Sequence, residues 1–346
     1  MNSDFSRFEP YVPETPLSTA NSKRKRGDGR IMKNLFTPVL MALSLAWSMS
    51  TSAQETNEFG VLVMAHGGSP EWNQGVLDTV APLAGDHTLE VAFGMADAVS
   101  LQEAVARLED RGASRIAVVR LFISGESWYE RTEQILGMRE GAPARDAEGH
   151  AEHMTAADSH AGHTMPTVAD KGSATAVMDH SMEFWQIDTD ASFALSKPGL
   201  AEAQEMGEVL LARASALSRN AAQEDVLILA HGPGDDAENE RWLVYIDARA
   251  EVIRAAHQFR SVKVATLRED WEEKRAAAEQ EVRAFVANSV ATSGTAIVIP
   301  YRVHSFGPYA DVLEGLHYVA DEKGLIPHEG VTRWIAAQIK ELHAKL

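Results

Sequence analysis

The chain has 346 residues, a length typical of two domains or of one large α/β unit, and it combines a formal net charge of −18 with a complete absence of cysteine. An acidic balance of that size argues against a nucleic-acid partner, which would need a basic face on the protein. Because cysteine is absent, disulfides, thiolate catalysis and zinc–thiolate sites are excluded, and a transition-metal site must use His, Met, Asp or Glu side chains.

The first 53 residues have the pattern of a targeting segment. Residues 1–31 are polar and are expected to be a non-native or disordered extension. From Met32, one lysine, an apolar run over residues 35–49 and small residues up to Ala53 predict a secretory signal peptide over residues 32–53. The apolar run is too short for a transmembrane helix, so we expect a periplasmic or secreted protein without a stable membrane span after cleavage. The alternative is a cytoplasmic N-terminal tail followed by an anchor, with the protein in the cytoplasm.

Apolar runs of strand length alternate with helical patterns in the rest of the chain. Strands are expected over residues 60–65, 89–93, 115–123, 225–230, 262–267 and 295–301. Helices are expected over residues 70–83, 200–217, 236–258, 272–290, 310–319 and 332–346, the last docking on the sheet. A capping box of the form [ST]-x-x-E at Ser100 predicts one more helix, which ends at Gly112.

This alternation indicates βαβ units and parallel sheets. We expect an α/β fold of two similar lobes, residues 59–138 and 196–346. Each lobe would be a parallel β-sheet flanked by helices, with a cleft between the two.

One short pattern occurs in both halves. An apolar run ends in His-Gly in VLVMAHGGSP (61–70) and again in VLILAHGPGDD (226–236). Ligands in open α/β sheets bind outside the carboxyl ends of the strands, so His66 and His231 are candidate site residues. In the alternative interpretation, each histidine caps the next helix or satisfies a buried backbone group.

These segments resemble the class II tetrapyrrole chelatases, and specifically the CbiX-type sirohydrochlorin cobaltochelatase family. The resemblance covers residues 60–136 and 225–334, and it is carried by VLVMAHGGS, LEVAFGMADAVSLQEAVARLEDRGASRIAVVRLFIS and IVIPYRVHSFGPYADVLEGL. It implies a tetrapyrrole substrate in the cleft and the insertion of a divalent metal ion with loss of two protons. Cobalt is the expected metal, with Ni, Fe or Cu as alternatives, and no organic cofactor is implied.

The resemblance also implies metal-binding histidines at the ends of the first and last strands of a lobe. The second lobe keeps both, His231 and His304, whereas the first keeps His66 alone. Where the family has Gly-x-His, the first lobe reads Gly125-Glu126-Ser127. We therefore expect the second lobe to carry the chemistry.

The proposed chemistry also follows from the residue types. Neutral imidazoles bind Co, Ni, Fe and Zn without the tight retention of thiolates, and a His or Glu near the metal can accept a pyrrole proton. Glu269 is the expected carboxylate partner, although it could instead be a solvated helix start. The macrocycle is expected to meet aromatic and basic side chains at the same strand ends, namely Phe306, Tyr309, Trp271, Arg302 and Arg268. In the alternative, the aromatic residues belong to the core.

Residues 139–183 differ in composition from both lobes. They contain few large apolar side chains, so they cannot bury enough surface to fold alone. We interpret them as a flexible insertion or an inter-lobe linker. Imidazole and thioether groups lie close together there, as weaker metal ligands: His150, His153, His160, His163 and His180, with Met154, Met165, Met178 and Met182. The alternative is a disordered polar loop of biased composition.

Two functions from different classes fit the sequence. The first is an enzyme that inserts a divalent metal into a sirohydrochlorin-type tetrapyrrole. The second is an exported relative of chelatase fold that binds metal or tetrapyrrole without catalysis. A monomer and a homodimer are both compatible with the sequence.

Overall fold

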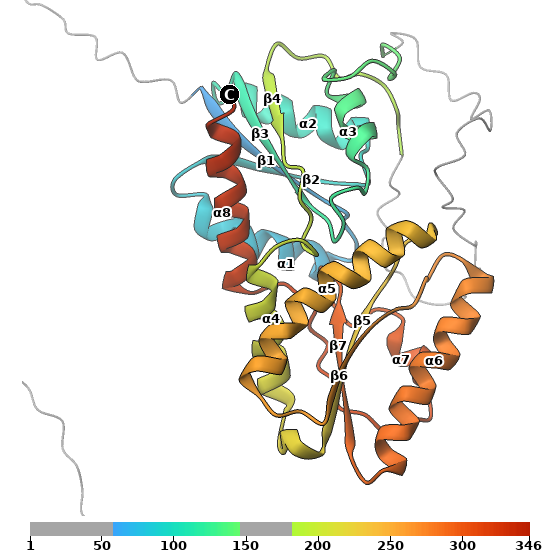
Figure 1. Cartoon of the computed structure of the whole chain (residues 1–346). Coiled ribbons are helices and arrows are strands. Elements are labelled where there is room, and N and C mark those ends of the chain that lie inside the picture. Colours follow the sequence, from blue (N-terminus) through green and yellow to red (C-terminus); the bar gives the residue numbers. More distant parts are fainter. Residues whose placement is uncertain (1–57, 146–181) are drawn as a thin grey trace, which may run out of the picture. The chain divides into compact units, whose positions relative to one another are not determined.

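The computed structural model describes residues 58–145 and 182–346 (Figure 1). The expected signal peptide and the five histidines between His150 and His180 lie outside these residues. None of the helices within the described ranges is long and apolar enough to cross a membrane.

Two parallel sheets organise the described chain, as the sequence predicted. The first contains four strands in the order β2-β1-β3-β4: β1 (Phe59–Ala65), β2 (Thr88–Phe93), β3 (Arg115–Leu121) and β4 (Ser192–Leu195). The second contains three in the order β6-β5-β7: β5 (Glu224–Ala230), β6 (Ser261–Thr266) and β7 (Thr295–Tyr301). The equal orders β2-β1-β3 and β6-β5-β7 support the duplicated pattern. The short edge strand β4 was not predicted.

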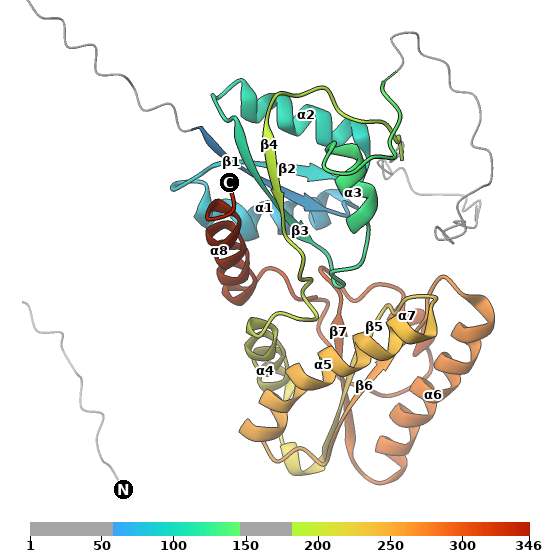
Figure 2. The same cartoon turned by 45° about the horizontal axis from the view of Figure 1, so that its top comes forward.

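Helices follow the strands on both faces of each sheet (Figures 1 and 2). Those that follow strands of the first sheet are α1 (Pro70–Val80), α2 (Ala98–Glu109), α3 (Tyr129–Ile135) and α4 (Glu205–Leu217), with a short 3-10 turn at Ala81–Leu83, and we count them with the first half. A second 3-10 turn at Ala221–Gln223 leads into β5, and the helices of the second half are α5 (Asp236–Ala256), α6 (Glu272–Ala291), α7 (Tyr309–Val312) and α8 (Glu329–His343).

The predicted start of α2 was wrong. The cap is Asp97, whose carboxylate accepts a hydrogen bond from the Ser100 backbone N–H at 2.8 Å. Asp97 also accepts from the Glu183 N–H at 2.9 Å. An Asp at this position caps a helix as well as Ser does, so the box pattern alone could not rank the two.

The helix predicted over residues 310–319 was also too long. Only α7 forms, and Gly315 then adopts a left-handed backbone with φ of 77°. Beyond it, the Val298 N–H donates to the carbonyl of Val319 at 2.8 Å, so the chain returns as a bridge beside β7. This pairing with the sheet competes with helix formation in the same segment.

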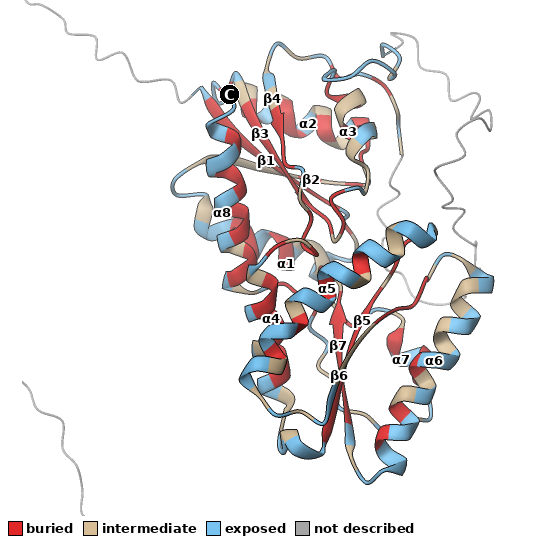
Figure 3. Ribbon diagram, viewed as in Figure 1, coloured by how far each residue is buried: buried red, intermediate tan, exposed pale blue. Residues whose placement is uncertain are grey.

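The central strands of both sheets are buried along their length (Figure 3), and alternate residues of these strands belong to different cores. In β1, Leu62 and Met64 face α2 and α3, whereas Val61 and Val63 face a core shared with the second sheet. In the second sheet, Leu227 and Leu229 face α6 and α7 in the same manner. The shared core contains apolar residues of α1, α4, α5 and α8 together with β1, β3, β5 and β7.

Helices α4 and α8 each cover the sheet of the other half. Helix α4 follows β4 of the first sheet, yet it contacts β7 of the second. Helix α8 follows the second sheet, yet it contacts β3 and β4 of the first. Its apolar stripe accounts for its burial, because Val331, Trp334, Ile335, Ile339 and Leu342 all lie in the shared core.

The residues just before and just after 146–181 lie next to each other. The Gln186 N–H donates to the carbonyl of Pro143 at 2.7 Å, and Ala144 and Gln186 form a parallel bridge. The Arg145 guanidinium lies 4.6 Å from the ring centre of Trp185, which is buried in the core of the first sheet. The chain therefore leaves and rejoins the first half of the fold at neighbouring positions.

Candidate functional site

The two repeated histidines have the same local geometry. His66 Nδ1 lies 2.8 Å from the Gly67 carbonyl, and His231 Nδ1 lies 2.7 Å from the Gly232 carbonyl. Because a carbonyl only accepts, Nδ1 carries the hydrogen in both rings, so Nε2 is the nitrogen that can bind a metal ion or a second proton. The turns require left-handed glycines, with φ of 82° at Gly67 and 79° at Gly232.

Most of the strained backbone lies near the carboxyl edges of the sheets. Of the six described non-glycine residues with positive φ, four follow strands, at Ala96, Trp128, Arg268 and Ser305, and the other two are Met182 and Ser293. Such conformations cost about 1–3 kcal/mol each and persist where the surrounding structure enforces them, commonly at functional sites. This distribution supports the edges that carry His66 and His231 as the place of a site.

His231 forms a close pair with Asp270. Its Nε2 lies 3.0 Å from Asp270 Oδ2, and both side chains are 31% exposed. With a hydrogen on Nδ1 as well, the ring in this pair is an imidazolium. Burial lowers the pKa of His231, but the hydrogen bond to Asp270 and the charges of Glu269 and Asp270 outweigh it, so that the pKa is raised.

Glu269, the carboxylate expected from the sequence, is held by another partner. Its Oε1 lies 2.5 Å from Arg302 Nη1, and its side chain is only 10% exposed. The negative charge of Glu269 still helps to raise the pKa of His231. The acidic pair at this strand end was visible in the sequence, but its order did not reveal that Asp270 is the residue that meets His231.

The side chains expected to contact a macrocycle are mostly engaged elsewhere. Phe306 and Tyr309 belong to the core beneath the second sheet. Arg302 pairs with Glu269, while Arg268 donates to the carbonyls of Pro233 and Gly234 and to Asp236. Trp271 is the exception, because it is only partly buried and its ring centre lies 6.5 Å from that of His231.

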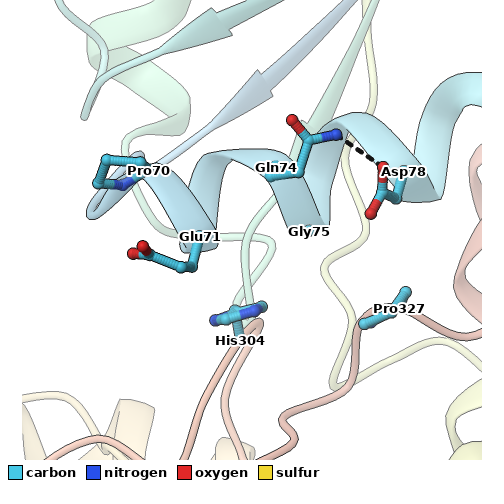
Figure 4. Close-up of a pocket in the computed structure, with 7 residues that line it drawn as sticks. All are labelled: Pro70, Glu71, Gln74, Gly75, Asp78, His304 and Pro327. Atoms are coloured by element: carbon cyan, nitrogen blue, oxygen red, sulfur yellow. Dashed lines mark hydrogen bonds between the residues drawn. The ribbon is translucent and has the colours of Figure 1, made fainter.

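His304 faces helix α1 of the first half (Figure 4). It lines an open pocket of about 480 Å³ with Pro70, Glu71, Gln74, Gly75, Asp78 and Pro327. A Cβ on Gly75 would lie 2.7 Å from the imidazole Cδ2, so the absence of a side chain there makes room for the ring. Burial lowers the pKa of His304, opposed by the charge of Glu71, and its buried Nδ1 has no hydrogen-bond partner.

The structure does not gather the expected ligands into one cluster. Within residues 58–145 and 182–346, no hydrogen bond, ion pair or ring contact joins His231 to His304. Across the same residues, no three His, Asp or Glu side chains converge in a group that could hold a metal ion. His231 with Asp270 is therefore a two-ligand arrangement, and His304 belongs to a neighbouring pocket.

The first-lobe counterpart of His304 is Ser124. Ala65 pairs with Leu121 as Ala230 pairs with Tyr301, and Ser124 and His304 each come three residues later. The fully buried Arg120 donates to the Gly125 carbonyl at 3.0 and 2.7 Å, and burial lowers the pKa of Arg120 to about 10. A buried cation that binds a loop carbonyl indicates a structural role for this loop.

No protein-family model matches the chain, and a search of curated proteins found no match to its sequence. Its fold resembles two solved structures, each of which aligns with 82% of this chain. SirB from Bacillus subtilis with Fe3+ has a TM-score of 0.52 at 12% identity, with 95% of that chain covered. The sirohydrochlorin chelatase SirB from Bacillus subtilis subspecies spizizenii in complex with cobalt has a TM-score of 0.50 at 11% identity, with 94% covered.

A third neighbour is a longer protein. DR2241 from Deinococcus radiodurans, a multi-domain protein with structural similarity to chelatases, has a TM-score of 0.48 at 17% identity, and this chain spans 55% of its length. The two SirB structures establish that the described chain has a chelatase-like α/β fold.

Proposed function

We propose that the protein binds a divalent metal ion at His231 and Asp270 and inserts it into a sirohydrochlorin-type tetrapyrrole. The observation that carries the proposal is the pairing of His231 Nε2 with Asp270 at 3.0 Å, at the carboxyl edge of the second sheet. The shared fold with SirB supports the class of reaction, and membership of the CbiX-type family is part of the same proposal.

Metal binding at this pair exchanges a proton for an ion. The ion takes the place of the hydrogen on Nε2 and gains an oxygen ligand from Asp270, while Nδ1–H stays bound to the Gly232 carbonyl. Imidazole with carboxylate suits Co, Ni, Fe and Zn. Two protein ligands leave the other coordination positions to water or to the macrocycle, so the ion can be passed on. Cobalt is our expected metal.

Insertion requires two N–H bonds of the macrocycle to break as its nitrogens bind the ion. When the ion leaves His231, Nε2 regains a lone pair and accepts one proton, and the resulting imidazolium is stabilised by Asp270. The second proton passes to water. Glu269 contributes through its charge, which raises the pKa of His231.

A second function is favoured by a different observation. His304 lies in a separate pocket, and Arg302 and Arg268 are engaged by protein groups. A protein that captures metal ions without inserting them needs neither His304 at the metal nor arginines for the macrocycle. An exported binding protein of chelatase fold is therefore the alternative.

Purified mature protein with Co(II) and sirohydrochlorin tests the two functions. We expect insertion, followed by absorbance, to exceed the uncatalysed rate and to fall to that rate in His231→Ala, with His257→Ala as a matched control. Co(II) binding that requires His231, without insertion by the wild type, would support the binding protein. If His231→Ala binds and inserts as the wild type does, the proposed site is wrong.

The proposal has two further parts, an export signal and additional metal ligands. We propose that residues 32–53 direct the protein to the periplasm or outside the cell, that His66 is a further metal ligand, and that the five histidines of residues 139–183 are weaker ones. Fractionation with N-terminal sequencing tests the first point. Replacing the five loop histidines should lower the metal stoichiometry, and an unchanged stoichiometry would contradict their role.

A further inference from the structure

An indole ring lies beside each of the repeated histidines. The ring centres of His66 and Trp72 are 6.3 Å apart, and those of His231 and Trp271 are 6.5 Å apart with the rings at 88°. Trp72 also lies 6.3 Å from His304. Both candidate strand ends therefore combine an imidazole with a large aromatic surface.

Each indole occupies the space that a glycine leaves open after the histidine. A Cβ on Gly68 would lie 3.1 Å from Trp72 Cγ, and a Cβ on Gly234 would overlap the Trp271 ring. Gly234 does not have a left-handed backbone, so its torsion angles do not require glycine. The Trp271 ring is what leaves no room for a side chain at Gly234.

The two indoles reach these positions from different elements. Trp72 lies in the first turn of α1, directly after the β1 loop, whereas Trp271 follows β6. The two tryptophans therefore do not occupy equivalent positions in the two halves, although each lies beside a repeated histidine.

Trp72 and Trp271 are partly exposed, as are Trp128 and Tyr129 after β3, whereas Phe306 and Tyr309 lie in the core. What distinguishes Trp72 and Trp271 is that each lies beside one of the repeated histidines. Indoles provide rigid apolar contact area at a small entropic cost, and they favour offset or edge-to-face packing on other π systems.

We propose that the indoles of Trp72 and Trp271 are the apolar contacts for the flat face of a tetrapyrrole beside the histidines. The inference rests on the proposed function and names the side chains that recognise its substrate. Trp271 is the principal contact, because it adjoins His231, which pairs with Asp270. Trp72 is the secondary contact, because it adjoins His66 in the first half of the chain.

Titration of the full mature protein with metal-free sirohydrochlorin, followed by absorbance, tests the proposal. We expect Trp271→Ala to weaken binding about tenfold and Trp271→Phe to retain most of it, since a ring remains. Trp72→Ala should weaken binding by a smaller factor. Tyr245→Ala is the matched control, because Tyr245 is a partly exposed aromatic residue on α5, away from these strand ends.

Gly234→Ala provides an independent variant. The new methyl group displaces the indole, so binding should weaken as in Trp271→Ala, and the double variant should bind no worse than Trp271→Ala alone. Additive losses in the double variant would show that Gly234 acts by another route and would count against the proposal.

The outcomes also separate this inference from the proposed function. His231→Ala should lose Co(II) binding, whereas Trp271→Ala should keep its Co(II) affinity within about twofold, because the indole is not a ligand. If the wild type inserts cobalt and both tryptophan variants bind sirohydrochlorin normally, the inference alone is overturned. If the wild type binds no sirohydrochlorin, the inference and the insertion reaction both fail.

Discussion

The imidazole of His231 is held at both nitrogens, by the Gly232 carbonyl and by Asp270. The sequence predicted the histidine and the acidic pair after β6, because apolar runs that end in polar residues mark the carboxyl edges of strands. It could not predict that Asp270 is the partner. That depends on the torsion angles of the loop, where Arg268 has a φ of 57°.

The raised pKa of His231 predicts how metal binding depends on pH. A metal ion competes with the proton on Nε2, so Co(II) affinity should fall as the pH drops through the raised pKa. Asp270→Asn removes the main group that raises the pKa, and should move the midpoint to lower pH. Co(II) titrations at a series of pH values measure both midpoints, and equal midpoints would contradict the pairing.

The His231–Asp270 pair also makes the free energy of unfolding depend on pH, and here its contribution falls as the pH rises. Since the pKa of His231 is raised in the folded state, the ion pair contributes its full stability below pH 6.5, the ordinary pKa of a histidine, and loses it as the pH rises through the folded value. Urea unfolding of the metal-free protein should therefore show a difference between wild type and Asp270→Asn at low pH that shrinks at high pH. A difference that grows with pH would contradict this assignment.

Gly75 gives a second test at the scale of one residue. Alanine in the middle of a helix is normally favoured over glycine by about 0.5–1 kcal/mol. At this position its methyl group would meet His304, so we expect Gly75→Ala to lower the free energy of unfolding by about 1–3 kcal/mol. The loss should disappear in a His304→Ala background. If it persists there, the contact is not its cause.

The strands are the elements that the sequence predicted best, because their apolar runs are long and end in His-Gly or in acidic residues. It missed β4, whose four residues are too few for a pattern. It could not assign α8 to one of the two sheets, because an amphipathic stripe indicates that a helix is buried but does not identify the sheet that buries it.

Helix α8 provides a prediction at the scale of an element. Trp334 is 2% exposed and lies in the core that contains strands of both sheets. Trp334→Ala should lower the free energy of unfolding by about 3–5 kcal/mol. Hydrogen exchange should then show reduced protection in β1 and in β5 together, whereas a loss confined to one sheet would argue against a shared core.

For the whole molecule, the formal net charge of −18 favours the approach of cations, which suits both proposed functions. The fold class was predictable from the alternation of strands and helices. The sequence could not predict that the described residues hold no preformed cluster of three ligands, because sequence spacing does not fix how side chains from different loops converge.

Metal binding should also appear in thermal unfolding of the whole protein. Co(II) at a hundredfold excess over its Kd should stabilise the folded state by about 2.7 kcal/mol and raise the Tm. His231→Ala should remove most of this shift, and Mg(II), which prefers oxygen ligands, should produce a smaller one. A Co(II) shift of the same size in His231→Ala would place the ion elsewhere.

The reciprocal positions of α4 and α8 have a consequence for dividing the chain. Each half supplies a helix that covers the other half's sheet. A cut between α4 and β5 would leave each fragment with a helix that has lost its sheet and with a sheet that has lost its helix. The two fragments would therefore have to reassociate to bury the apolar residues that the intact chain holds in one core.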